Sequence, residues 1–385
     1  MINIFRLNQK KLHVLFICGW YPSRVLPTNG DFIERHAQAV AKQHKVSVIH
    51  LITDKKITKD IELSTKVINE IETHIAYLKE VKNPIKKIYL FLKAFSLLLK
   101  KVSVFDIVHL NELFPFGVFS LYLKWFKKKP FIISEHWTAY KHPLSNKISF
   151  IEKTISKIIV KNASYICPVS NDLASSMQSL DLKGNYKRVP NVVNTNLFFP
   201  DHKKNEIFTI THVSNMNDKH KNVKGLLHVI AKLEVENIDF KFNIIGKNSI
   251  KYLKYANKLG LDSKKIKFMN QIPHTEIAKE LRNSNLFVLF SNYENLPCVI
   301  LESFSCGVPV ISTNVGGISE YFPDNFGKLI IKNDEEKLKE EILNFYNKKN
   351  NVATKDEMHT YVKSLFSEQA IANNFTNLYY KTLSI

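Results

Sequence analysis

The chain has few of the features that mark secreted or metal-binding proteins. It contains 4 cysteines among 385 residues, with no C-x-x-C pair and no histidine at metal-ligand spacing. Each cysteine lies in or beside an apolar run, which is typical of buried, reduced thiols and indicates a reducing compartment. These residues are Cys18, Cys167, Cys298 and Cys306. No metal ion and no other cofactor is expected.

Long hydrophobic runs are also missing. No stretch of roughly 18 or more uncharged apolar residues occurs, so no membrane-spanning helix is predicted. The first apolar run, Leu12–Cys18, is followed by Trp20-Tyr21-Pro22 and lacks a small-residue cleavage site. We interpret it as a core strand and not as a signal peptide, so a cytoplasmic protein is expected.

Three common catalytic motifs are absent. No G-x-G-x-x-G follows an apolar run and no Walker lysine motif occurs, which argues against a dinucleotide-dependent dehydrogenase and a P-loop NTPase. There is no G-x-S-x-G element either, which argues against an α/β-hydrolase.

What the chain does contain is a regular alternation of short apolar runs and helical patterns. This alternation predicts an α/β protein with parallel sheets covered on both faces. Strands are expected at Leu12–Cys18, Val46–Ile52, Ile107–Leu110, Pro130–Ser134, Tyr165–Val169, Phe208–Val213, Phe240–Ile245, Lys267–Met269, Leu286–Leu289, Pro309–Ser312 and Lys328–Ile331. Helices are expected at Asp31–Gln43, Ile148–Lys161, Val223–Val235, Ile250–Leu259 and Ser367–Leu383, with a further helix from Asn171 capped by Ser170.

The alternation pauses once, at residues 188–202. This segment, RVPNVVNTNLFFPDH, is rich in proline and asparagine and is interpreted as a linker. A length of 385 residues suits two domains. We therefore expect two doubly wound, Rossmann-like domains at 1–195 and 196–365, followed by a closing helix at 366–385. Ligands of such sheets bind beyond the carboxyl ends of the strands, which would form a cleft between the two domains.

The chain is strongly basic, with a formal net charge of +20. The lysines are spread along the sequence without a recognition helix, zinc finger or aromatic RNA-binding motif, so nucleic acid is not the expected partner. DNA binding stays open as a third function, which salt-sensitive retention on DNA without turnover of a nucleotide sugar would favour. A basic cleft would also suit an anionic substrate.

An anionic membrane surface fits the charge better than nucleic acid does. The segment Ile85–Phe105, IKKIYLFLKAFSLLLKKVSVF, combines leucines and aromatics with five lysines. It resembles a basic amphipathic helix that lies on lipid, which predicts peripheral attachment to the inner face of the plasma membrane. An ordinary helix that covers a sheet explains the pattern equally well. 

The segment with the most chemical information is SNYENLPCVILESFSCGVPVISTNVGGISE, residues 291–320. Glu294 and Glu302 are eight residues apart, with Pro297 between them. Because proline favours the first turn of a helix, we place Glu294 on the preceding loop and Glu302 two turns inside the helix. The backbone N–H groups near Leu296, Pro297, Cys298 and Val299 would then form a positive helix terminus for a diphosphate.

Together with the C-G-V-P-V and G-G-I-S-E elements that follow, this segment resembles the donor-binding signature of the retaining family-4 glycosyltransferases, which have the GT-B fold. The resemblance extends over nearly the whole chain, and it implies that the closing helix at 366–385 packs back on the first domain. It implies that Glu294 contacts the hydroxyls of the transferred sugar and that Glu302 holds the ribose of a nucleotide-sugar donor. Asn295 and Leu296 stand where the family usually has Gly-Phe.

Further matches to the family lie elsewhere in the chain. In the segment beginning GWYPSRVLPTNGDF, Gly30 matches the glycine that lets backbone approach the donor phosphate. His136, in SEHWTAY, matches a histidine that contacts the transferred sugar. Lys221 matches a phosphate-binding lysine, whereas Asn215 is nearest the position of its usual arginine partner. Either Lys219 or Lys224 substitutes for this arginine, or the phosphate is held with less charge. Gly246, in IIGKN, matches the glycine turn under the nucleotide.

The resemblance implies a transferase that retains anomeric configuration without a metal ion, and the sequence has no D-x-D motif. The leaving phosphate would help deprotonate the acceptor, and His136, Glu294 and Lys221 would support the reaction. The expected acceptor is a glycan or lipid-linked molecule of the cell envelope, as in polysaccharide, lipopolysaccharide or capsule synthesis. A nucleotide-sugar epimerase of the same fold and a catalytically inactive, membrane-associated scaffold are the alternatives.

Overall fold

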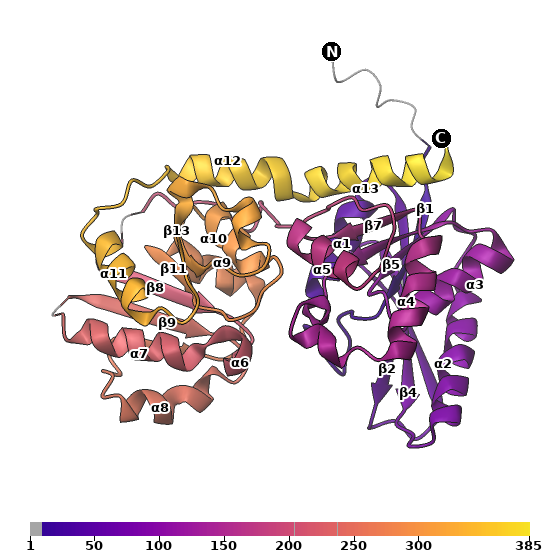
Figure 1. Ribbon diagram of the computed structural model, residues 1–385, viewed down its shortest axis with the longest axis horizontal. Helices are drawn as coiled ribbons and strands as arrows, with labels where there is room; N and C mark the ends of the chain where they lie inside the picture. The colour runs from indigo at the N-terminus through magenta and orange to yellow at the C-terminus, as the bar shows by residue number, and fades with distance from the viewer. Residues whose placement is uncertain (1–9, 204, 237) are drawn as a thin grey trace, which may run out of the picture. The chain divides into compact units, whose positions relative to one another are not determined.

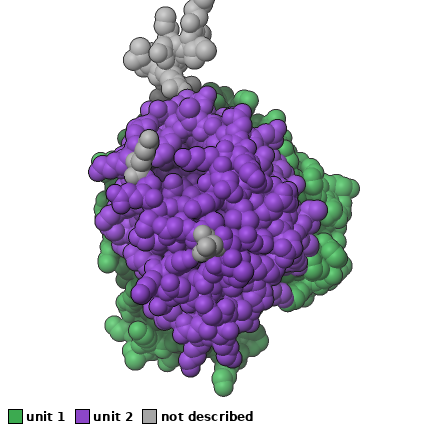
Figure 2. All heavy atoms as spheres, turned by 90° about the vertical axis from the view of Figure 1, so that its left-hand side faces the viewer, with its two compact units in different colours: residues 1–192, 368–385 green, residues 193–367 purple. Residues whose placement is uncertain are grey.

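The computed structural model describes residues 10–203, 205–236 and 238–385. The chain divides into two compact units, coloured separately in Figure 2. Unit 1 consists of Met1–Val192 with Glu368–Ile385, and unit 2 consists of Val193–Ser367. Each unit is built around one sheet, and Figure 1 shows helices on both faces of each.

Unit 1 contains a seven-stranded sheet in the order β3-β4-β2-β1-β5-β6-β7. Neighbouring strands are parallel except β3, which runs antiparallel to β4. The strands are β1 His13–Cys18, β2 Lys45–Asp54, β3 Ile61–Ile68, β4 Ile71–Lys79, β5 Ile107–Asn111, β6 Phe131–Glu135 and β7 Tyr165–Pro168. All residues of β1, β5 and β6 are buried, as expected for parallel strands covered on both faces.

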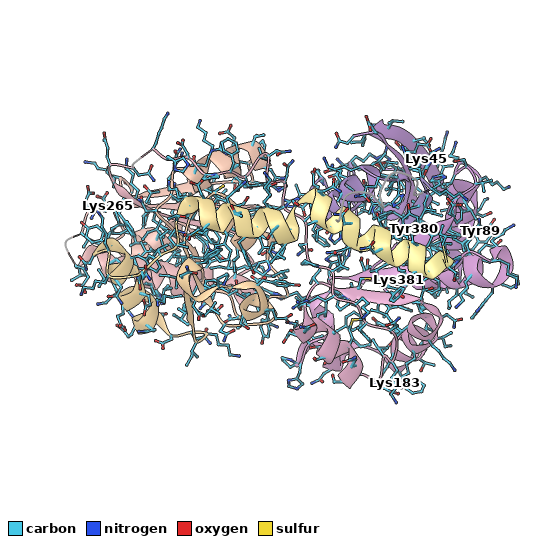
Figure 3. The ribbon with its side chains drawn as sticks, turned by 90° about the horizontal axis from the view of Figure 1, so that it is seen from above. Lys45, Tyr89, Lys183, Lys265, Tyr380 and Lys381 are labelled. Carbon is cyan, nitrogen blue, oxygen red and sulfur yellow. The ribbon has the colours of Figure 1, made fainter. Side chains whose placement is uncertain are left out.

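The helices of unit 1 cover this sheet and include the last helix of the chain. They are α1 Asp31–Ala41, α2 Pro84–Leu99, α3 Gly117–Lys127, α4 Phe150–Asn162, α5 Asn171–Ser179 and α13 Glu368–Leu383. On α13, Ile371, Phe375 and Tyr379 are fully buried in the core beside β1 and α1. Tyr380, labelled in Figure 3, adds a hydrogen bond of 2.9 Å from its hydroxyl to the Lys10 carbonyl. The amphipathic pattern at the end of the sequence therefore forms a core helix of unit 1.

Unit 2 contains a six-stranded parallel sheet in the order β10-β9-β8-β11-β12-β13. The strands are β8 Phe208–Val213, β9 Phe240–Ile245, β10 Ile266–Met269, β11 Leu286–Leu289, β12 Val310–Thr313 and β13 Gly327–Ile330. The helices are α6 Asp218–Lys221, α7 Val223–Glu234, α8 Leu253–Lys258, α9 His274–Arg282, α10 Cys298–Ser305, α11 Glu335–Tyr346 and α12 Lys355–Phe366. The predicted α/β class with Rossmann-like sheets is confirmed.

Several local predictions differ from the structure. The sequence predicts no strand or helix between β2 and α2, whereas in the structure this segment forms the antiparallel hairpin of β3 and β4. The helix expected at Ile250–Leu259 is a 3₁₀ turn over Ser249–Tyr252 followed by α8. Glu302 is the fifth residue of α10 and lies about one turn inside it, because Pro297 precedes the helix as its N-cap. The sequence-based prediction, which places Pro297 in the first turn and Glu302 two turns inside the helix, therefore starts the helix too early.

Cys18, Cys167 and Cys306 are buried, whereas Cys298 is only partly buried, so the prediction is wrong for that thiol. Among the described residues, every helix is too short or too polar to cross a bilayer. Within the same residues, no group of three or more His, Cys, Asp or Glu side chains is placed to hold a metal ion.

Candidate functional site

The sheet order of unit 2 defines where its ligand site should lie. From β8 the chain continues to β9 on one side of the sheet, and later returns to β11 on the other side. Ligands of doubly wound sheets bind at such a switch point, beyond the carboxyl ends of the two strands. The residues that follow β8 and β11 lead to Lys221 and to Glu294, respectively.

The loop after β8 is held in place by hydrogen bonds from buried and partly buried side chains. The buried ring of His212 contacts the Val288 carbonyl oxygen at 2.9 Å through Nδ1 and the Ser214 hydroxyl at 2.8 Å through Nε2. The Ser214 hydroxyl accepts the Met216 N–H at 3.1 Å. Met216 has a left-handed backbone with φ 57°, and its carbonyl accepts the Tyr252 hydroxyl at 3.0 Å. Burial lowers the pKa of His212 to about 4, so its ring is neutral and acts as a fixed support.

Lys221 and Glu294 form an ion pair at the switch point. The two side chains are 15% and 9% exposed, so the pair is mostly shielded from water. Their loops are also joined through the backbone, because the Asn292 N–H donates to the His220 carbonyl at 2.7 Å. The structure thus brings together two predicted site residues that are far apart in sequence, and it adds a direct contact between them that the sequence did not indicate.

The helix α10 begins directly beside Glu294. Asn295 and Leu296 are buried in the loop, Pro297 caps the helix, and Cys298 and Val299 form its first turn. The Asn295 carbonyl accepts the Gly317 N–H at 2.9 Å, which ties the G-G element to this loop. Glu302 is 4% exposed on the same helix. The positive end of the α10 dipole therefore lies beside the Lys221–Glu294 pair, where it favours an anionic group.

Gly246 directly follows β9 and lies next to the loop after β8. Its φ is 153°, and a Cβ atom at this position would lie 1.8 Å from the Ser214 carbonyl oxygen. The Gly246 N–H donates to the Met269 carbonyl at 3.0 Å. Glycine is therefore required for the backbones of Gly246 and Ser214 to approach each other.

The region of the missing arginine is polar. Asn215 is exposed, and its side-chain oxygen accepts the Asn217 N–H at 3.1 Å, forming a local turn. Lys224 lies 5.5 Å from the centre of the Tyr255 ring, whereas Lys219 is exposed and its carbonyl accepts the Asn292 side chain at 3.2 Å. These contacts do not indicate that either lysine binds a phosphate.

In unit 1, Gly30 closes the loop between β1 and α1. It is the N-cap of α1 with φ 74°, and a Cβ there would lie 2.5 Å from the Trp20 carbonyl carbon. Its carbonyl accepts the Ile33 and Glu34 N–H groups at 2.9 and 3.1 Å. Gly30 is therefore fixed by a left-handed backbone and a close approach to Trp20, in addition to any role toward a ligand.

His136 follows β6 in the same unit. Its backbone N–H donates to Glu135 Oε1 at 2.8 Å, and its ring lies 4.6 Å from the Phe32 ring and 5.2 Å from the His36 ring. Burial, followed by the neighbouring rings of His36 and His109, lowers the pKa of His136 well below its usual range. A neutral imidazole can donate and accept hydrogen bonds but carries no charge for an anion.

Sequence reasoning missed the supports of the loop after β8, namely His212, Ser214 and Tyr252. Their only signal is a polar side chain at or beyond the end of an apolar strand, which many turns share. Tyr252 lies 36 residues from Met216, whose carbonyl it binds, and no spacing rule connects them.

Comparison with protein families matches both units. Residues 31–197 match the family described as Glycosyltransferase Family 4, and residues 194–364 match the family described as Glycosyl transferases group 1. An uncharacterised glycosyltransferase of Methanocaldococcus jannaschii is 28% identical over 245 residues, which cover 63% of this chain and 66% of that protein. The chain spans smaller shares of two other curated relatives that it matches, 44% and 46% of their length.

Solved structures show the same fold. The sucrose-phosphate synthase of Thermosynechococcus elongatus matches with a TM-score of 0.76 and 16% identity, covering 97% of this chain and 100% of that one. The HepE protein of Anabaena in complex with UDP matches with a TM-score of 0.72 and 15% identity, covering 97% and 100%. The two Rossmann-like sheets of this chain are those of the GT-B fold.

Proposed function

Because the chain belongs to the glycosyltransferases that the family 4 and group 1 models describe, we propose that it moves a hexose-type sugar from a nucleoside-diphosphate donor to a glycan or lipid-linked acceptor, with retention and without a metal ion. The observation that carries this proposal is the shielded Lys221–Glu294 pair beside the N-terminus of α10. The structure of HepE with UDP-glucose supports a sugar nucleotide as the donor.

The proposed chemistry breaks the bond between the anomeric carbon and the diphosphate oxygen and forms a bond from that carbon to an acceptor oxygen. The leaving diphosphate takes the proton of the acceptor hydroxyl. Lys221 and the backbone N–H groups at the start of α10 stabilise the negative charge that develops on the diphosphate. Glu294 accepts hydrogen bonds from the sugar hydroxyls, Glu302 accepts them from the ribose, and the neutral ring of His136 supports the transferred sugar. Gly30 and Gly246 let backbone approach the donor.

Nucleotide binding can be tested by thermal unfolding with a panel of nucleoside diphosphates and nucleotide sugars. A ligand at one hundred times its dissociation constant should add about 2.7 kcal/mol to the free energy of unfolding. We expect Glu302→Ala to lose this response, because it removes the carboxylate that would hold the ribose. Glu340→Ala, on the exposed side of α11, should keep it. If no nucleotide stabilises the native chain, or if Glu302→Ala responds fully, the proposed donor site is wrong.

We extend the proposal to the membrane, because α2, α3 and α4 expose apolar side chains among lysines. These helices lie side by side: Phe91 and Phe95 of α2 stack on Phe119 of α3, and Trp125 of α3 donates to Asn162 of α4 at 3.3 Å. We call their outer side the lysine–aromatic face. Its exposed apolar residues are Ile85, Ile88, Tyr89, Leu92, Tyr122, Trp125, Phe126, Phe150, Ile151 and Ile158. Tyr89 is labelled in Figure 3, at the outer edge of unit 1.

The helix α2 thus has two apolar sides. This is compatible with both explanations of its sequence, a helix that covers a sheet and a helix that lies on lipid. Leu90, Ala94 and Leu98 are buried and cover the sheet, whereas the residues of the lysine–aromatic face point outward. A cavity of about 1130 Å³ in unit 1 is lined by Ile88 and Phe91 of α2 and by the ends of β2 and β4. We propose that an apolar anchor of a lipid-linked acceptor occupies this cavity.

Vesicle sedimentation tests the lysine–aromatic face. The chain should sediment with vesicles that contain anionic lipid, and added salt should release it, because each lysine near the surface contributes about 1 kcal/mol. Replacing Tyr89, Leu92 and Phe126 by serine should abolish sedimentation. Val235→Ser, which removes an apolar side chain that is 84% exposed in unit 2, should leave it intact. Equal sedimentation of both variants would remove the basis for membrane attachment.

A further inference from the structure

We propose that Glu112 of unit 1 is a recognition residue that binds a hydroxyl group of the acceptor sugar. This inference rests on the proposed glycosyltransferase function and extends it to the acceptor sugar. Four observations carry it: the position of Glu112 in the sheet, its backbone conformation, its shielded oxygen atom, and the glycine beneath it.

The position of Glu112 is the switch point of unit 1. From β1 the chain continues to β2 on one side, and it later returns to β5 on the other side. Gly19 directly follows β1, and Glu112 directly follows β5. The Gly19 N–H donates to the Asn111 carbonyl at 3.0 Å, so the two strand ends are joined. Glu112 therefore occupies in unit 1 the crevice where ligands of such sheets bind, as Glu294 does in unit 2.

The backbone of Glu112 is held in an unfavourable conformation. Its φ is 78°, in the left-handed region that side chains rarely adopt. Its N–H donates to the Ser134 carbonyl at 3.3 Å. Left-handed residues other than glycine persist only where the surrounding structure fixes them, and they gather at functional sites.

The Glu112 carboxyl lacks a partner for one oxygen. The side chain is 8% exposed, and Oε2 forms no hydrogen bond within the described residues. By contrast, the neighbouring Glu135 accepts the N–H groups of Leu113, His136 and Trp137, and Glu294 faces Lys221. Buried polar atoms are normally paired, so an unpaired oxygen at a ligand crevice indicates a missing partner.

The absence of a side chain at Gly19 leaves space for the Glu112 carboxyl. A Cβ atom on Gly19 would lie 1.7 Å from Glu112 Oε2, so any other residue there would displace the side chain. Nearby, Tyr140 is 2% exposed and its hydroxyl also has no partner within the described residues. Glu112 and Tyr140 are close enough to interact electrostatically.

The chemistry of these groups selects a neutral hydroxyl. Burial, followed by the nearby carboxylates of Glu135 and Glu152, raises the pKa of Glu112 to about 9. A protonated carboxyl offers one O–H donor and an acceptor oxygen, which suits an alcohol, whereas the surrounding carboxyls disfavour a phosphate.

The test uses the full chain with octyl glycosides of glucose, galactose and mannose as probe acceptors, in saturating nucleotide. Infrared difference spectra of the native chain should show a shift of the carbonyl band of a protonated carboxyl when a glycoside binds. Glu112→Gln should lack this band but keep a donor and an acceptor. Its dissociation constant for the glycoside should stay within a few-fold of the native value. Glu112→Leu should weaken glycoside binding roughly 10- to 100-fold, because the hydroxyl then loses its partner.

A pH series separates recognition from a structural role. Glycoside binding by the native chain should weaken as the pH rises through about 9, because the ionised carboxyl loses its donor, while Glu112→Gln should show no such change. A glycoside-independent carboxyl band, or equal glycoside binding by Glu112→Leu, would overturn the inference. If the native chain shows no thermal response to any nucleotide, the proposed donor site fails, and that result is separate from these outcomes.

Discussion

Replacing Lys221 by methionine is expected to lower kcat/KM for sugar transfer by about 100- to 1,000-fold, the usual effect of removing one group that stabilises charge in a transition state. Lys221 is 15% exposed and lies against Glu294 beside the start of α10. Its ammonium group acts where water is largely excluded, so little solvent can replace its charge. Steady-state kinetics with the nucleotide sugar that best stabilises the chain would measure the loss.

A charge-matched set of variants separates catalysis from stability. Lys221→Met alone removes one partner of a mostly buried ion pair, which should also lower the free energy of unfolding by about 3 kcal/mol. Adding Glu294→Gln removes the second charge and should restore much of this stability, but it should not restore the rate. Lys241→Met, on the exposed side of β9, should leave both unchanged.

Two outcomes would count against the role of Lys221. If the double variant recovers the rate together with the stability, the ion pair is structural and the charge on the diphosphate is stabilised by other groups. If Lys221→Met keeps its rate, Lys219→Met and Lys224→Met become the informative variants, since these lysines flank Lys221 in the sequence and are the candidate substitutes for the missing arginine.

The central strands of unit 2 could be predicted from the sequence because nearly all of their residues are buried. The predicted bounds of Phe208–Val213, Phe240–Ile245 and Leu286–Leu289 coincide with β8, β9 and β11. A strand covered by helices on both sides requires a continuous apolar run, and such runs are visible without any partner.

The hairpin of β3 and β4 shows where this signal fails. No residue of β3 is fully buried, and its sequence IELSTKVI mixes polar and apolar side chains. The turn uses Asn69 and Glu70, both with positive φ, instead of a glycine that would have marked it. An exposed edge strand with an unmarked turn leaves neither an apolar run nor a turn motif in the sequence.

The candidate site was predicted residue by residue but not as an arrangement. Lys221 and Glu294 could each be placed near the end of a strand, yet their pairing depends on β8 and β11 being neighbours. The sheet order is not the order of the sequence, because β9 and β10 lie on the other side of β8. Glu112 was not predicted for the same reason, since its importance arises from the adjacency of β1 and β5.

Replacing Gly246 by alanine should lower the free energy of unfolding by about 3 to 5 kcal/mol, near the upper end for single substitutions. The added Cβ would lie 1.8 Å from the Ser214 carbonyl oxygen, which is backbone and cannot rotate away. Moving the backbone segments of Gly246 and Ser214 apart would disturb the hydrogen bond of 3.0 Å that the Ser214 N–H donates to the Ile245 carbonyl. The loop that carries Lys221 would shift with Ser214, so the thermal response to nucleotide should be lost as well.

Gly260 provides the matched control for this prediction. It has φ 74°, also in the left-handed region, but a Cβ there would meet no atom within 4 Å. Gly260→Ala should therefore cost only the backbone term, about 1 kcal/mol, and should keep the nucleotide response. Urea unfolding of the two variants measures the difference. Equal losses would mean that Ser214 can move freely, and the loop after β8 would then not be the rigid support that the contacts of His212 and Tyr252 indicate.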